Sequence, residues 1–92
     1  MTDEVDDIQR VEITDTLDLH FFPAKIAVSV TDEYLREARR LGLPEVRIIH
    51  GRGKGIMRQH VLALLGRHPS VRSFDASEIG STLVLLKGAK KP

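Results

Sequence analysis

The hydrophobic patterns along the chain predict an α/β fold, a two-layer sandwich with the element order strand, helix, strand, helix, strand, strand. Two observations carry this prediction. Each of two stretches with apolar residues at helical spacing follows a short apolar strand, and the last strand is apolar on both faces. Two right-handed crossovers made in the same direction place both helices on one face. A central last strand then gives a four-stranded mixed sheet of order 1-2-4-3.

The first strand is clearest at residues 17–21, after an alternating pattern that starts at Val11. Period two places Leu17, Leu19 and Phe21 on one face of the strand, and Asp18 and His20 together on the other. The strand therefore combines an apolar face with a face that carries reactive side chains.

Two amphipathic helices follow the first two strands. The first is expected from Ala24 to Leu41, with Pro23 suited to its first turn and Gly42 to its C-terminal cap. The second is expected from about Ile56 to Gly66. Their predicted buried stripes consist of Ala27, Val30, Tyr34, Ala38 and Leu41 in the first helix, and Met57, Val61, Leu64 and Leu65 in the second.

The remaining strands are short apolar runs at residues 46–49, 71–74 and 82–86. The 92 residues form one domain, which we expect to span residues 11–88 between a mobile acidic arm (1–10) and a basic tail (89–92). No apolar run approaches the ~20 residues that cross a membrane, and the chain has no cysteine. We expect a cytoplasmic protein without a membrane partner, monomeric unless it pairs with itself.

The charges are unevenly distributed along the chain. Residues 1–18 carry seven acidic side chains and one base, whereas residues 46–74 carry six bases and no acid. A basic zone of this kind indicates a polyanionic partner such as DNA or RNA.

The loop after the second strand has the composition of a phosphate site. Glycines leave backbone N–H groups accessible, a helix N-terminus attracts anions, and interleaved cations add charge. A plain basic connector is the alternative. The predicted phosphate-binding residues are Gly51, Arg52, Gly53, Lys54 and Gly55 in the loop and Arg58 in the following helix.

Two distant stretches should meet at one edge of the sheet. Strands one and two are predicted to be parallel neighbours, so their carboxyl ends lie side by side, where ligands collect in open α/β sheets. Those ends carry Asp18, His20 and His50. Histidine titrates near neutral pH, which makes His20 and His50 candidates for proton transfer. Asp18 is a candidate to orient a histidine, hold a metal ion or activate a nucleophile.

These residues resemble the Smr (small MutS-related) domain. The resemblance rests on Leu17-Asp18-Leu19-His20, on His50-Gly51-Arg52-Gly53 with Gly55, and on the closing Gly80-Ser81-Thr82-Leu83-Val84 strand. It covers about residues 16–87 and implies the same sandwich, nucleic-acid binding and, in several members, endonuclease activity on DNA or RNA. Many members have a glycine directly after the first histidine. This chain has Phe21 there, which we interpret as the mark of short stand-alone members.

Two functions follow from the resemblance and the residues. The first is an endonuclease with Asp18, His20 and His50 as catalytic residues, and the second is a DNA- or RNA-binding module that does not cut. The resemblance implies metal-dependent activity in some members and metal-independent activity in others, so magnesium or manganese is the cofactor to consider. The histidines and Asp18 lack the local spacing of a zinc site, and no metal ligand is assigned. With three phenylalanines and one tyrosine, a base-stacking platform is not expected.

Overall fold

A computed structural model of the protein describes residues 13–51 and 55–88, and its elements follow the predicted order. The predicted arm and tail, and the loop residues Arg52, Gly53 and Lys54, lie outside these ranges. The elements are β1 (Thr16–Asp18), α2 (Ala24–Arg40), β2 (Glu45–Ile49), α3 (Ile56–Leu65), β3 (Val71–Asp75) and β4 (Ser81–Leu86).

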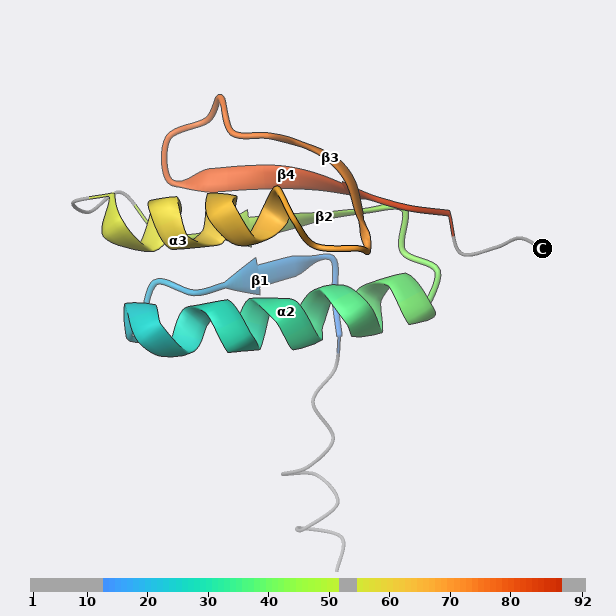
Figure 1. Ribbon diagram of the computed structural model, residues 1–92, viewed down its shortest axis with the longest axis horizontal. Helices are drawn as coiled ribbons and strands as arrows, with labels where there is room; N and C mark the ends of the chain where they lie inside the picture. Colours follow the sequence, from blue (N-terminus) through green and yellow to red (C-terminus); the bar gives the residue numbers. More distant parts are fainter. Residues whose placement is uncertain (1–12, 52–54, 89–92) are drawn as a thin grey trace, which may run out of the picture.

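The four strands form one mixed sheet of order β1-β2-β4-β3. β1 pairs with β2 in parallel, while β4 pairs with both β2 and β3 in antiparallel fashion. The helices α2 and α3 pack against each other and lie on the same side of the sheet (Figure 1). The predicted two-layer sandwich, including its strand order, is therefore confirmed.

Alternation along the central strands separates the two faces of the sheet. In β2, Val46 and Ile48 are buried towards the helices, whereas Arg47 and Ile49 are only partly buried on the other face. The same alternation buries Thr82, Val84 and Leu86 of β4. The central position predicted for this strand is confirmed.

The first helix ends one residue earlier than predicted. Pro23 is the N-cap, with φ −61° and ψ 146°, and Leu41 is the C-cap ahead of Gly42, whose φ is +84°. Leu41 is therefore 52% exposed, and its predicted burial is wrong because it lies beyond the last helical turn. The buried stripe instead consists of Ala27, Thr31, Tyr34, Leu35 and Ala38, and Val30 packs at its edge.

The second helix keeps the predicted stripe. Val61, Leu64 and Leu65 are buried, and Met57 packs against the core while partly buried. Within residues 13–51 and 55–88, neither helix has the length and apolar character that a membrane span needs.

The first strand is shorter than predicted, since the chain turns after Asp18. Leu19 still donates its N–H to the carbonyl of Ile49 (2.7 Å), but its own carbonyl accepts the N–H of Phe22 (2.8 Å). Phe21 consequently lies on the turn and is 86% exposed, and its predicted place on the apolar face is wrong. The turn carries His20 to the surface at the carboxyl edge of the sheet.

Candidate functional site

The two strand ends meet, as predicted, at the carboxyl edge of the sheet. His20, His50 and Gly51 line one open pocket of about 690 Å³. Gly51 has a φ of +88°, and a Cβ placed on it would lie 3.4 Å from Cβ of His20. The first glycine of the loop therefore packs directly against the histidine of the first strand end.

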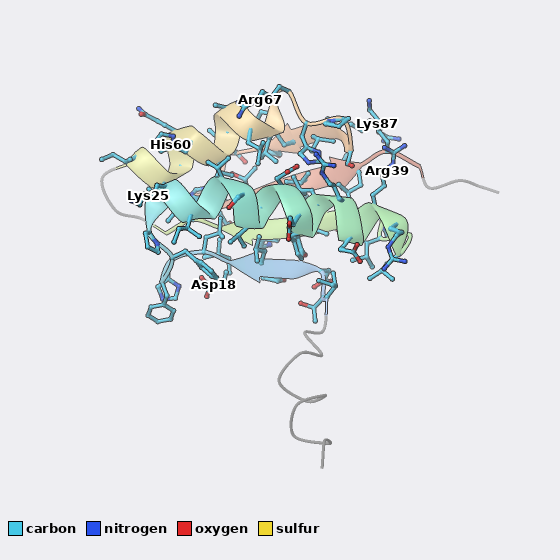
Figure 2. The ribbon with its side chains drawn as sticks, turned by 60° about the horizontal axis from the view of Figure 1, so that its bottom comes forward. Asp18, Lys25, Arg39, His60, Arg67 and Lys87 are labelled. Carbon is cyan, nitrogen blue, oxygen red and sulfur yellow. The ribbon has the colours of Figure 1, made fainter. Side chains whose placement is uncertain are left out.

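Asp18 holds the ring of His20 in one orientation. Its Oδ1 accepts hydrogen bonds from Nδ1 (2.5 Å) and from the backbone N–H of His20 (3.1 Å). These bonds, the side-chain bond first, hold the pKa of Asp18 below its usual value, so the carboxyl is ionised at neutral pH. Both side chains are nearly half exposed, 44% for His20 and 47% for Asp18. Figure 2 shows Asp18 at the end of β1.

The second ring nitrogen of His20 is the one available for chemistry. Because Nδ1 donates to Asp18, Nε2 carries the lone pair of the neutral ring. Among the described residues, Nε2 has no hydrogen-bond partner. The ring of Phe21 packs on the same imidazole, with the ring centroids 3.8 Å apart. His20 is thus an oriented proton acceptor at the edge of the pocket.

His50 has the opposite surroundings. It is only 4% exposed, and both ring nitrogens have partners. Nδ1 lies 3.3 Å from the carbonyl oxygen of Gly51, which can only accept, so Nδ1 donates. Nε2 then accepts the hydroxyl hydrogen of Thr82, at 3.0 Å. Burial above all, with a contribution from the nearby charge of Arg58, lowers the pKa of His50, although the Gly51 carbonyl opposes this shift.

The start of the loop is fixed by the segment that leads into β4. The carbonyl of Gly80 accepts the backbone N–H groups of both His50 and Gly51, each at 3.0 Å. Gly51 and Gly55 line a second hollow of about 240 Å³ together with Arg58. Arg58 is partly buried and donates from Nη2 to the carbonyl of Ala76 (3.3 Å).

Three of the predicted phosphate-binding residues therefore lie together. Gly51, Gly55 and Arg58 surround this smaller hollow at the N-terminus of α3. The other three, Arg52, Gly53 and Lys54, lie outside the described residues, and their predicted role stays a prediction.

A polar cluster on the open face of the sheet was missed by the sequence analysis. Arg47 donates from Nη1 to Glu78 (2.7 Å) and to the hydroxyl of Ser81 (3.1 Å), and Ser81 donates to the same Glu78 oxygen (3.2 Å). Alternation in β2 could have placed Arg47 on this face, but Glu78 lies in a link without a periodic pattern. The larger pocket is lined by His20, Arg47, Ile49, His50, Gly51, Met57, Glu78, Ile79, Gly80 and Ser81.

The described residues do not form a metal cage. Within residues 13–51 and 55–88, no group of three His, Cys, Asp or Glu side chains is placed to hold a metal ion. Among the described residues, Asp18 is the one carboxylate bonded to His20, and the ring nitrogens of His50 are already bonded. Magnesium commonly binds through one or two carboxylates together with substrate phosphates. A role of Asp18 in holding a metal ion therefore stays a prediction.

Comparisons with known proteins match this chain to one family. The family model of the Smr domain matches residues 17–87. Endonuclease MutS2 of Clostridium tetani is 44% identical over 64 residues, which cover 70% of this chain and 8% of that protein. Endonuclease MutS2 of Caldicellulosiruptor bescii is 38% identical over 85 residues, covering 87% of this chain and 11% of that protein. The chain thus spans about a tenth of the length of these relatives.

Solved structures have the same fold. The Smr domain of Thermus thermophilus MutS2 superposes with a TM-score of 0.75 at 37% identity, covering 80% of this chain and 99% of that one. YdaL of Escherichia coli, a stand-alone small MutS-related protein, gives a TM-score of 0.74 at 23% identity, covering 88% of this chain and 70% of that one. At 23% identity, the comparison with YdaL shows a shared fold only.

Proposed function

The chain belongs to the Smr domain family, and from this premise we propose that it binds DNA or RNA through the phosphate backbone and cleaves it as an endonuclease. The arrangement of His20 carries the proposal: Asp18 bonds Nδ1, the side chain lies at the pocket edge, and Gly51 packs against it. The MutS2 relatives named as endonucleases support it.

Phosphate binding is assigned to the smaller hollow. Gly51 and Gly55 have no Cβ there, the first turn of α3 leaves backbone N–H groups unpaired, and Arg58 contributes a positive charge. Arg52 and Lys54 add two further cations between these glycines in the sequence. A backbone phosphate is the ligand that this combination of donors suits best.

Cleavage is assigned to His20 with Asp18. Nε2 of the neutral imidazole takes the proton of the attacking oxygen, which is water on DNA and either water or the adjacent 2′-hydroxyl on RNA. A bond forms between this oxygen and phosphorus while the bond from phosphorus to the leaving oxygen breaks, and the leaving oxygen takes a proton from water. The carboxylate of Asp18 stabilises the imidazolium that results, because an ionised acceptor strengthens the hydrogen bond to Nδ1.

His50 receives a different role from the one that the sequence suggested. With both ring nitrogens bonded and the ring buried, it has no free lone pair for a substrate proton. Its bonds link Thr82 of β4 to the carbonyl of Gly51. We therefore assign His50 as a positioning residue that holds Gly51 against His20.

Incubation of the purified protein with supercoiled DNA and with structured RNA tests the proposal. Each substrate is tested with magnesium, with manganese and with EDTA, beside a His20→Ala sample prepared in the same way. We expect cleavage by the parent and its loss in the variant. Binding without cleavage under every condition would contradict the endonuclease and leave the non-catalytic binding module, and the absence of binding would contradict both functions.

A further inference from the structure

Two adjoining hollows at this edge of the sheet differ in chemistry. Both include Gly51 and share the segment Glu78–Gly80 as a common wall. The smaller hollow contains the cation of Arg58, whereas the larger pocket has apolar side chains from three elements or links. These are Ile49 of β2 and Met57 of α3, together with Ile79 of the link before β4, which borders both hollows.

The charges in the larger pocket do not favour a phosphate. Arg47 is already paired with Glu78 at 2.7 Å, so the two charges compensate each other. Arg47 therefore brings no uncompensated positive charge to a phosphate. The pair instead offers hydrogen-bond donors and acceptors to a neutral ligand, together with the hydroxyl of Ser81.

An apolar side chain stands at the edge of this pocket. Ile79 is 78% exposed, although it lines the pocket. Together with the partly buried Ile49 and Met57, Ile79 gives the pocket an apolar wall beside a few polar groups, a combination typical of ligand-binding clefts. Phe21 is also exposed, but it packs on His20 and does not line the pocket.

We propose that the larger pocket holds one unpaired nucleobase beside the phosphate bound at Gly51, which borders both hollows, so that the substrates are single-stranded or locally unpaired nucleic acids. This inference rests on the proposed function. Ile79, Ile49 and Met57 contact the faces of the base, and Arg47, Glu78 and Ser81 bond its polar edge. A base inside a duplex is stacked and paired and cannot enter, whereas an unpaired base can be splayed out into a protein pocket.

Equilibrium binding of three labelled ligands tests this inference. The ligands are a short single strand, an abasic strand of the same length and charge, and a perfect duplex, all at one salt concentration. The protein variants are Ile79→Ala and, as a matched control, Leu41→Ala. Leu41 is another exposed apolar residue, located at the C-terminal cap of α2 outside both hollows.

We expect the parent to bind the single strand about tenfold more tightly than the abasic strand, because contact between a base and an apolar side chain adds affinity. Ile79→Ala should remove most of this difference, and its effect on the affinities for the abasic strand and the duplex should be much smaller, although Ile79 also borders the smaller hollow. Leu41→Ala should change none of the three, and both variants should melt at the temperature of the parent.

The possible failures are distinguishable. Equal affinity for the single strand and the abasic strand, with cleavage still dependent on His20, would overturn the base pocket alone. An equal loss of affinity for all three ligands in Ile79→Ala would also overturn it, because the side chain would then act on the backbone site. Absence of binding to any nucleic acid would overturn the proposed function and this inference together.

Discussion

The ends of β1 and β2 lie side by side and each carries a histidine, yet the two side chains have opposite surroundings. His20 is nearly half exposed and bonded at one nitrogen by a carboxylate, whereas His50 is buried and bonded at both. The comparison shows that strand topology brings the two histidines together but does not show which of them can transfer a proton. Exposure and the number of free lone pairs decide which histidine can move a proton.

The difference originates in the alternation of each strand. His50 continues the buried series of Val46 and Ile48, so its ring enters the layer between sheet and helices. His20 has the parity of Asp18, opposite to the buried Leu19, and the turn after β1 leaves both on the surface. One histidine is therefore buried with the core and the other lies at the open pocket.

Replacing His20 should give the largest effect on activity. His20→Ala should slow cleavage by about a hundredfold or more, the usual loss for a proton-transfer group, without a change in melting temperature. The measurement is the initial rate of cleavage beside a thermal melt. His60→Ala is the matched control, because His60 is an exposed histidine on α3, away from β1 (Figure 2). An equal loss of rate in the control would contradict a specific role for His20.

Disrupting the bonds of His50 should lower the free energy of unfolding more than it lowers the rate of cleavage. Thr82→Val leaves Nε2 of the buried ring without its donor, which costs about 1–3 kcal/mol of unfolding free energy. His50→Ala should cost a similar amount, and the double variant less than the two costs added together, since the second change removes the group left unpaired. Chemical denaturation of the four proteins measures this coupling. Strict additivity would show that the bond to Thr82 does not support the fold.

Two glycines of similar backbone conformation test whether the contact between the two strand ends matters for cleavage. Gly42 and Gly51 have φ of +84° and +88°, but an added Cβ meets open space at Gly42 and Cβ of His20 at Gly51. Alanine at either position should cost about 1–2 kcal/mol of stability for the left-handed conformation. Only Gly51→Ala should also slow cleavage, because its added Cβ contacts the side chain of His20. Equal rates in the two variants, measured below their melting temperatures, would contradict that contact.

The pH dependence of stability should give the smallest effect. The pKa of His50 is lowered by folding, so below about pH 6.5 the unfolded chain binds a proton that the folded chain does not. The free energy of unfolding should therefore decrease as the pH falls from about 7 to 5, by at most about 1.4 kcal/mol per pH unit from this group. The parent should lose more stability than His50→Ala over this range. Parallel curves for the two proteins would show that His50 is not held neutral.

Much of the fold could be predicted from the sequence because its periodic patterns are strong. The central position of β4 follows from its two apolar faces, and the C-terminus of α2 lies close to its glycine. The early end of β1 could not be predicted, since it depends on bonds from His20 to Asp18 and from Phe22 to Leu19, which compete with strand pairing. Leu41 was misplaced for a related reason, because a capping residue interrupts the helical period.

The candidate site was predictable in part. The meeting of Asp18, His20 and Gly51 follows from the parallel order of the first two strands. The bond from Thr82 to His50 depends on the antiparallel register of β4, in which Thr82 lies opposite Ile48. No local sequence pattern predicts this register. Glu78 and Ile79 come from an irregular link, where side-chain direction has no period.

Chemical modification of the histidines tests the central claim most directly. Diethyl pyrocarbonate acylates accessible neutral imidazoles, and peptide mass spectrometry gives the rate at each histidine while cleavage is assayed in the same samples. The account predicts that activity is lost at the rate at which His20 is acylated and that His50 stays unmodified. A bound oligonucleotide should protect both the activity and the His20 side chain. The exposed His60 should react without affecting activity. Activity that persists when His20 is fully acylated, or that is lost in step with His50, would contradict the account.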